Sequence, residues 1–568
     1  MGREGLIAVL VGLVLGSTPV SFAYAQDPGQ AQPRVELPKP TLQPALPAPT
    51  PPPEVATPDL PLAAPEAEDA PATVPQAPQP VEEAPPSAAA QAQADPVVAT
   101  LRALLGDAAL RKQANEADLA ALESFYTARA TPLWITEMGF TAKAQAALFE
   151  IEKAADFGLD AAEFDLPRAE MLPKDADAQA LAELKLDLAI LQYARHARGG
   201  RFKPSEISSL FDQEPPLRDP KLVLAEIATS EAPDAYLRSL HPQHVQFVRL
   251  REALLKARVV GEDGRAAPYD VETKRLIINM ERWRWMPEDL GQTFVLNNSA
   301  AFMLYVFKEG KRIYADKILV GTIGYATPVF SADMRTIVFN PDWIAPETVV
   351  KENLWPPLQR GNFSILRVHK LFVSYNGKPV DPTKIDWRRV DPLNFTFLQK
   401  AGPHNNLGKV KFLYPNRHTV YMHDTLPVRK KYFKQKNRMI GHECVRMEQP
   451  LRFAEILLAE ANGMSPGRVK ELWDKGNNSA VTLEKKIPVH MVYFTATVDD
   501  EGKVETATDI YGLDRKMAAA MFGSTTGFPQ PPPEPKKPPA GEASMSTSTS
   551  TRAADNDISR AMQGFFGD

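Results

Sequence analysis

The spacing of apolar residues divides the chain into a helical first part and a strand-rich second part. From residue 96 to about 265, apolar side chains recur every three or four positions, the spacing of one face of an α-helix. Short breaks containing Gly199-Gly200 and Pro215-Pro216 interrupt this pattern. We therefore predict a helical scaffold domain over residues 96–265. Its predicted helices span residues 99–105, 115–126, 142–157 and 178–198.

After Trp285 the pattern changes to short runs of β-branched and aromatic residues separated by turn residues. Glu309-Gly310-Lys311 and Asn376-Gly377 are typical of hairpin turns. A helix is predicted at residues 451–461, closed by the cap Asn462-Gly463. The fold class is therefore α+β, with a β-rich second domain over residues 280–522. Its predicted strands span residues 294–296, 302–307, 317–320, 336–339, 410–414, 419–423 and 489–498.

The two ends of the chain differ in composition from the middle. Arg3, the apolar run 6–15 and Ala23-Tyr24-Ala25 form the three parts of a secretory signal peptide over residues 1–25. This run is shorter than the about 20 residues that span a bilayer, so no transmembrane span is expected after cleavage; an uncleaved anchor is the alternative. The Pro/Ala-rich linker 26–95 and the tail 527–568 have too few apolar residues to offset ordering, so we predict disorder in both.

Charge and cysteine usage narrow the function. The net charge of −5 gives no indication of nucleic acid or an anionic membrane as the main partner. The chain contains one cysteine, Cys444. An exported protein usually pairs its cysteines or has none, and a single cysteine cannot form an internal disulfide. The structural alternative is a buried, inert thiol that packs as a small hydrophobic side chain.

The neighbours of Cys444 favour a reactive thiol. A thiol becomes a nucleophile when a base and positive charge favour its thiolate form. His423 ends a predicted strand, and a loop of basic residues leads from it to Gly441-His442-Glu443-Cys444. We therefore predict that Cys444 is a nucleophile and His423 its base, although a solvated surface is the alternative for the basic loop. The basic residues of this region are Lys430, Lys431, Lys434, Lys436, Arg438 and Arg446.

Several blocks of sequence, in one order over roughly residues 100–520, resemble the large L,D-transpeptidases with a YkuD-type catalytic domain, in the YcbB-like branch. Separate blocks in the right order are more specific than a lone Cys–His pair. The blocks are residues 279–285, 327–331, 338–343, 386–392, 407–412, 423–425 and 444–446.

The resemblance implies a role for each residue near the thiol. Cys444 matches the family's nucleophile and His423 its catalytic base, and the main-chain carbonyl of Asp424 would orient the imidazole. The main-chain N–H groups of Glu443 and Cys444 would form an oxyanion hole. In addition, the two residues expected to line the substrate channel are His442 and Arg446.

The resemblance also implies a reaction. The enzyme would be a cysteine-dependent acyltransferase that attacks the L-centre carbonyl of diaminopimelate in a peptidoglycan stem tetrapeptide. D-Ala would leave, and an amine of a neighbouring stem would resolve the thioester to give a 3→3 cross-link. The implied location is the periplasm and the implied partners are donor and acceptor stem peptides. We expect a monomer without a cofactor, a metal or nucleic acid.

Three features depart from the family pattern. The usual Ser-His-Gly-Cys is Gly441-His442-Glu443-Cys444 here. If that position requires a positive φ, Glu443 would be strained there, and its charge would oppose thiolate formation. Leu426 is an extra residue before Pro427, so the lid over the site is expected to differ. The interval 249–279 is too short for the peptidoglycan-binding module of larger members, so the catalytic domain or its lid must capture the substrate.

Four alternatives stay open at this stage. A zinc site from His423, His442 and Cys444 uses ligand types, but His-x-Cys is not a structural zinc spacing. A papain-like protease would have its cysteine far before its histidine. The protein could be a catalytically weak peptidoglycan-binding or regulatory protein with the same fold. It could also keep the acyl-enzyme and use water, as an L,D-carboxypeptidase or endopeptidase, or a protein amine, as in lipoprotein attachment.

Overall fold

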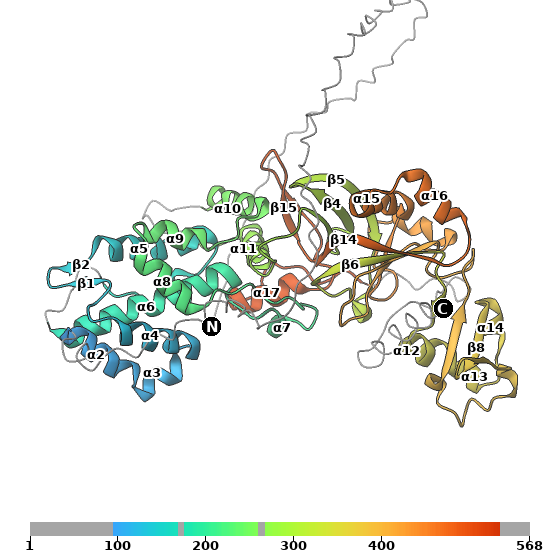
Figure 1. Ribbon diagram of the computed structural model, residues 1–568, viewed down its shortest axis with the longest axis horizontal. Helices are drawn as coiled ribbons and strands as arrows, with labels where there is room; N and C mark the ends of the chain where they lie inside the picture. The colour runs from blue at the N-terminus through green and yellow to red at the C-terminus, as the bar shows by residue number, and fades with distance from the viewer. Residues whose placement is uncertain (1–94, 169–174, 259–266, 534–568) are drawn as a thin grey trace, which may run out of the picture. The chain divides into compact units, whose positions relative to one another are not determined.

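The computed structural model describes residues 95–168, 175–258 and 267–533. The predicted signal peptide, nearly all of the Pro-rich linker and most of the predicted tail lie outside these residues. Figure 1 shows the helices α2–α6, α8 and α9 grouped together, and the strands β4, β5, β6 and β14 of the second domain grouped separately. The predicted order, a helical domain followed by a β-rich domain, is confirmed. No helix in the described ranges is both long and apolar enough to cross a membrane.

The first domain is built from helices around a hydrophobic core of its own. Most of them begin directly after an Asp, Asn or Thr whose side chain accepts a hydrogen bond from a main-chain N–H of the first turn, for example Asp95, Asn115 and Asp175. A short hairpin, β1 (Ile135–Thr136) and β2 (Gly139–Phe140), was not predicted. The helices are α2 (Pro96–Leu105), α3 (Ala108–Gln113), α4 (Glu116–Ala128), α5 (Ala142–Glu152), η1 (Ala154–Phe157), η2 (Ala161–Glu163), α6 (Ala176–Gly199), α7 (Pro204–Ile207), α8 (Pro220–Thr229), α9 (Pro233–Ser239) and α10 (Val245–Ala257). Of these, α7 and α10 pack against the hydrophobic core of the second domain.

A buried group of polar side chains, here named the acid cluster, ties α4 to α6. It consists of Tyr126, Trp134, Glu183 and Asp187. The hydroxyl oxygen of Tyr126 lies within hydrogen-bond distance of Glu183 (2.9 Å) and of Asp187 (2.7 Å), and its single proton can be donated to one of them at a time. The indole N–H of Trp134 donates to the other oxygen of Asp187 at 2.7 Å. The main-chain N–H of Trp134 lies 3.1 and 3.0 Å from the two oxygens of Glu183. Every carboxyl oxygen of the cluster thus has a hydrogen-bond partner, which compensates for the loss of water on burial.

Helix α11 (Val271–Arg284) connects the helical domain to the second domain. Its side chains are buried over most of its length. Arg282 forms an ion pair with Asp514 at 2.7 Å, and Trp283 stacks on Phe494 with 4.5 Å between ring centroids. On the other side, Arg284 donates to the carbonyl of Phe157 at 2.7 Å. The 279–285 block of the sequence resemblance is therefore the joint between the two domains.

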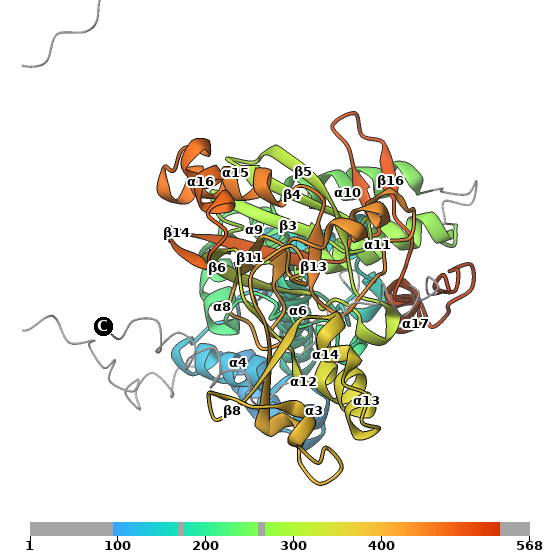
Figure 2. The same ribbon diagram turned by 90° about the vertical axis from the view of Figure 1, so that its right-hand side faces the viewer.

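Eight strands of the second domain close into a barrel in the order β11-β12-β13-β5-β4-β3-β14-β6. Figure 2 shows β3, β4 and β5 side by side, with α15 and α16 next to them. One face of each strand contributes to the hydrophobic core. The barrel strands are β3 (Thr293–Asn298), β4 (Met303–Lys308), β5 (Lys311–Leu319), β6 (Phe330–Phe339), β11 (Val410–Leu413), β12 (Met422–His423), β13 (Val445–Met447) and β14 (Ser479–Val492).

The segment 340–409, between β6 and β11, forms the lid, which has a four-stranded sheet and a separate hydrophobic core. Figure 1 shows it in yellow, beside the barrel. Its elements are β7 (Trp343–Ile344), α12 (Glu347–Val349), η4 (Val350–Leu354), α13 (Trp355–Gln359), α14 (Ser364–Val368), β8 (Leu371–Tyr375), β9 (Lys378–Pro379), η5 (Pro382–Lys384), η6 (Pro392–Asn394) and β10 (Phe395–Gln399).

The other elements of the domain are η3 (Ile323–Tyr325), η7 (Pro427–Lys434), α15 (Pro450–Asn462), α16 (Pro466–Asp474), β15 (Ala496–Val498), β16 (Val504–Thr506) and α17 (Leu513–Phe522).

Several predicted strands are wrong in extent. Three observed strands begin earlier than predicted: β5 at Lys311, β6 at Phe330 and β14 at Ser479. The predicted strand 489–498 is divided into β14 and β15, because Thr495 leaves the barrel to bond Asn279 and Asp514. The predicted strand 419–423 is reduced to β12, because Thr419 has φ 53° in a turn that the side chain of Asn416 holds. The predicted cap is confirmed, since Gly463 ends α15 at φ 63°.

The packed structure continues past the start of the predicted tail. Phe528 is only 4% exposed and belongs to the hydrophobic core of the second domain. Its carbonyl accepts a hydrogen bond from Arg515 of α17 at 2.5 Å. The chain is therefore anchored at least as far as Phe528.

Candidate active site

His423 and Arg446 lie on the face of the barrel sheet opposite the hydrophobic core. Side chains of a strand alternate between its two faces. Val445 and Met447 of β13 belong to the core, so Arg446 between them lies on the other face. Met422 of β12 also belongs to the core, so its neighbour His423 shares the face of Arg446. Cys444 directly precedes β13 and is close enough to Arg446 for their charges to interact.

The strand register aligns three basic side chains across this face. Strands β12 and β13 are parallel, with His423 opposite Arg446. Strands β11 and β12 are antiparallel, with Lys411 opposite His423. Residues directly opposite one another have Cβ atoms about 5 Å apart. Lys411, His423 and Arg446 therefore form a continuous row, here named the basic row, next to Cys444.

His423 is completely buried, and its environment favours the neutral ring. Burial and, after it, the positive charge of Arg446 lower its pKa well below the usual 6.5, against smaller opposing effects of the main chain at Asp424 and Leu407. Within the described residues, neither ring nitrogen has a hydrogen-bond partner of normal geometry. A neutral histidine with an open nitrogen is the form that can accept a proton from a thiol.

Cys444 is 2% exposed and forms no disulfide. The guanidinium of Arg446 is close enough to interact with the charge of the thiolate, which opposes the lowering of the Arg446 pKa by burial. Two tyrosines that the sequence did not single out are also close. Tyr421 lies 5.8 Å from His423 between ring centroids, and the thiolate charge adds to the burial that raises the pKa of Tyr414.

The expectation that Glu443 would be strained by a positive φ is wrong. Glu443 is not among the residues with positive φ; the positive φ belongs to Gly441, at 118°. A Cβ at Gly441 would lie 2.4 Å from Nη1 of Arg446, so this position needs glycine. The carboxyl of Glu443 is half-buried, and burial raises its pKa to about 7. Glu443 is therefore largely neutral below pH 7 and opposes thiolate formation only above it.

Asp424 is also buried, and its side chain holds the turn before β11. Its carboxylate accepts a hydrogen bond from the main-chain N–H of Lys409 at 3.0 Å. Gly408, at φ 64°, leaves room for it, because a Cβ there would lie 2.4 Å from the Asp424 carboxylate. This turn places Leu407 beside the His423 ring. The sequence assigned Asp424 a main-chain role, and the contact of its side chain was not foreseen.

A loop between β5 and β6 is fastened to the segment before Cys444. The main-chain N–H of Thr322 donates to the carbonyl of Gly441 at 3.0 Å, and the hydroxyl of Thr327 donates to the carbonyl of Glu443 at 2.8 Å. His442 stacks on Tyr325 with ring centroids 3.7 Å apart. The hydroxyl of Tyr325 also donates to Glu352 of the lid. The segment 441–443 is thus held from the loop side, and the loop in turn touches the lid.

The basic loop is largely held by local contacts. Arg438 donates to the carbonyls of Phe302 (2.9 Å) and Ile318 (3.2 Å). Lys430 lies 3.7 Å from the Asp424 carboxylate. Of the six basic residues named from the sequence, Arg446 is the one in the row beside the thiol. Arg438 and Lys430 are therefore engaged by the main chain and by Asp424.

No three metal-ligand side chains of the His, Cys, Asp and Glu types come together anywhere in the described ranges. This applies to His423, His442 and Cys444, the set considered for zinc. His442 instead stacks on Tyr325, as described above.

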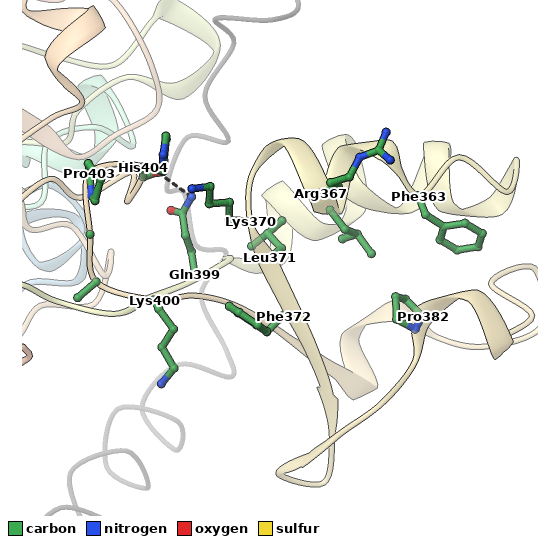
Figure 3. Close-up of a pocket in the computed structure, with 13 residues that line it drawn as sticks. Phe363, Arg367, Lys370, Leu371, Phe372, Pro382, Gln399, Lys400, Pro403 and His404 are labelled. Atoms are coloured by element: carbon green, nitrogen blue, oxygen red, sulfur yellow. Dashed lines mark hydrogen bonds between the residues drawn. The ribbon is translucent and has the colours of Figure 1, made fainter.

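The lid contains a separate cavity of about 560 Å³ that does not include the thiol (Figure 3). Helix α14 forms one side, and β8 with the loop after β10 forms the other. Gln399 fixes this loop by donating to the carbonyl of His404 at 2.8 Å. The cavity combines apolar side chains with a few cations. Its lining includes Phe363, Leu371, Phe372, Arg367, Lys370 and Lys400.

Comparison with known proteins agrees with this arrangement. Residues 120–254 match the model of a Scaffold domain, and residues 291–480 match the model of the L,D-transpeptidase catalytic domain. A curated Haemophilus influenzae protein named "Putative L,D-transpeptidase" is 31% identical over 248 residues, which are 44% of this chain. The match spans 50% of that protein's length, so the chain corresponds to about half of its relative.

A solved structure, the Ldtfm–avibactam carbamoyl enzyme, aligns with 43% of this chain and 79% of its own chain. The identity is 12% and the TM-score is 0.15, so the similarity adds no argument about the site.

Proposed function

We propose that the protein cross-links peptidoglycan through an acyl-enzyme on Cys444, because residues 291–480 match the model of the L,D-transpeptidase catalytic domain and residues 120–254 that of a Scaffold domain. The proposed donor is a stem tetrapeptide. The terminal D-Ala leaves, and an amine of a neighbouring stem takes the acyl group to form a 3→3 cross-link. We propose that this occurs in the periplasm, after export directed by residues 1–25.

The observation that supports this proposal most strongly is the strand register. His423 is paired with Lys411 on one side and with Arg446 on the other, and Cys444 directly precedes the strand of Arg446. Burial keeps His423 neutral, so it can receive the thiol proton. Arg446 supplies positive charge next to the thiolate. These are the groups that acyl transfer to a cysteine requires.

The steps of the proposed reaction follow from these groups. The sulfur of Cys444 attacks the L-centre carbonyl while His423 takes the thiol proton. The main-chain N–H groups of Glu443 and Cys444 would stabilise the negative oxygen; within the described residues, the N–H of Glu443 forms no hydrogen bond. The C–N bond breaks and D-Ala leaves with the proton from His423. The acceptor amine then attacks the thioester while His423 takes one of its protons, and the sulfur leaves as thiolate.

The thiol is nearly inaccessible, so the donor must displace part of its cover. Cys444 is 2% exposed. The segment before it is held by Thr322, Thr327 and Tyr325, and Tyr325 is connected to the lid through Glu352. We propose that the loop 321–327 moves when the donor binds.

The test is product analysis with the purified mature protein and disaccharide-tetrapeptide. The expected products are free D-Ala and cross-linked dimers, both absent with Cys444→Ala. Tripeptide without dimers would indicate water as the acceptor and an L,D-carboxypeptidase. An added lipoprotein peptide carrying a lysine amine tests the third acceptor. Failure to release D-Ala with any acceptor would overturn the proposal and favour a binding or regulatory protein.

A further inference from the structure

Lys411 is an ionised side chain in a place where water cannot fully solvate it. It lies on β11 between Val410 and Phe412, which are completely buried in the core, so it points to the opposite face. Its side chain is only partly exposed. Burial lowers the pKa of the ammonium group from its usual 10.5, which shows that the charge is held in an unfavourable environment.

The described chain provides no partner for this charge. Lys411 forms no ion pair and no side-chain hydrogen bond within the described residues, and the one carboxylate that acts on it is Asp342. Asp342 is already engaged, since it pairs with Lys400 at 3.0 Å and accepts from the main-chain N–H of Ala401 at 2.8 Å. A poorly solvated charge without a partner costs stability, so a ligand that supplies the counter-charge gains affinity there.

The position of Lys411 identifies that ligand's chemistry. It is directly opposite His423, and His423 is directly opposite Arg446. The backbones at Lys411 and His423 are therefore about one strand spacing, roughly 5 Å, apart, and both side chains lie on the same face. This is within the length of a short peptide whose scissile carbonyl is at Cys444. A stem tetrapeptide carries carboxylates on both sides of that carbonyl.

We propose that Lys411 is the carboxylate-binding residue for the donor stem peptide, at the end of the basic row. This inference rests on the proposed function for the identity of the donor and deepens it. Lys411 would select donors that present a free carboxylate at a fixed distance from the bond that is cleaved. It would thereby determine specificity without taking part in proton transfer.

Equilibrium binding separates this inference from the chemistry. Binding of soluble stem tetrapeptide to the Cys444→Ala protein is measured by calorimetry, which requires no acyl transfer. A charge-assisted hydrogen bond contributes about 1.5–3 kcal/mol, so adding Lys411→Met should weaken binding about 10- to 100-fold. Lys411→Arg should retain most of the affinity. The matched control is Lys308→Met, the same substitution at an exposed barrel lysine that pairs with Glu460 at 2.9 Å.

Three modified donors identify the carboxylate. They carry an amide at the terminal D-Ala, at the D-centre of diaminopimelate or at the D-Glu α-carboxyl. One of the three amides should weaken binding to the protein that retains Lys411 by about the same factor as the Lys411→Met substitution does. The same amide should have little effect on binding to the Lys411→Met protein. Thermal stability should be unchanged or higher in Lys411→Met, because an unpaired charge is removed; a large loss would indicate a structural role.

The inference is overturned if Lys411→Met binds the unmodified tetrapeptide as tightly as the Lys411 protein, or if it keeps full discrimination against all three amides. The proposed function fails separately, if protein with an intact Cys444 releases no D-Ala while binding still depends on Lys411. Each of the two proposals therefore has a result that contradicts it alone.

Discussion

The acid cluster of the helical domain and the basic row of the catalytic domain both bury ionisable side chains, but in opposite ways. In the acid cluster, Tyr126 and Trp134 provide donors for the oxygens of Asp187. In the basic row, both ring nitrogens of His423 and Nε of Arg446 lack partners in the described chain. A satisfied buried group stabilises the fold, whereas an unsatisfied one is costly unless a ligand completes it. From this difference we infer that the acid cluster stabilises the fold, whereas the basic row binds a substrate and takes part in catalysis.

The largest expected effect is on catalysis when His423 is replaced. His423→Gln should slow acylation of Cys444 about 10²- to 10⁴-fold, the usual contribution of a positioned general base. The thermal midpoint should change by only a few degrees, because His423 makes no hydrogen bond of normal geometry to lose. Stopped-flow release of D-Ala and a thermal melt measure the two quantities. His404→Gln, at an exposed histidine of the lid cavity, is the control.

In the acid cluster, a substitution should lower stability and leave catalysis unchanged. Asp187→Ala leaves the hydroxyl of Tyr126 with one acceptor fewer and the indole N–H of Trp134 with none. An unpaired buried donor costs about 1–3 kcal/mol, and the cavity adds to it. We expect a clear loss of stability, measured by urea unfolding, with unchanged turnover per folded molecule. A stable variant with reduced turnover would contradict the division of roles.

The two regions should also respond oppositely to pH. Burial raises the pKa values of Glu183 and Asp187. Their contribution to stability is complete below the unfolded pKa of about 4 and is lost as pH rises through the raised values. The pKa of His423 is lowered, so its contribution is present above about 6.5 and lost as pH falls. From pH 7.5 to 5, hydrogen exchange should show a higher opening free energy for α6 and a lower one for β12. Asp187→Asn should flatten the response of α6 alone.

A smaller effect is expected at Glu443, whose pKa is raised to about 7 by burial. Below pH 6 the carboxyl is neutral, and Glu443→Gln should react with iodoacetamide as the original protein does. Above pH 8 the carboxylate opposes the thiolate, so Glu443→Gln should react about three- to tenfold faster. Cys444 is the only thiol, so the rate reports this site directly. A constant ratio across the pH range would show that Glu443 has no electrostatic effect on Cys444.

The sequence predicted the elements better than the contacts between them. Apolar spacing predicted α2, α4, α5, α6 and α15, the last with its Gly463 cap, but none of the other α-helices by range. The lone Cys444 after His423 indicated the proposed reactive pair. Lys411 was part of a matching block, but nothing in its neighbours along the chain shows which residue of β12 it faces. That register depends on how β6, β11 and β12 align, over separations that local patterns do not encode. For the same reason the φ of Gly441 and the loop contact of Tyr325 became visible only in the structure.

The most direct test of the central claim is the intact mass of the protein after brief mixing with disaccharide-tetrapeptide. The account predicts a mass increase equal to the donor minus D-Ala, located on the peptide that contains Cys444. The increase should be absent in Cys444→Ala and strongly delayed in His423→Gln. An unchanged mass in freshly reduced protein, or an adduct that is still formed by Cys444→Ala, would contradict the claim that Cys444, beside the basic row, forms the acyl-enzyme.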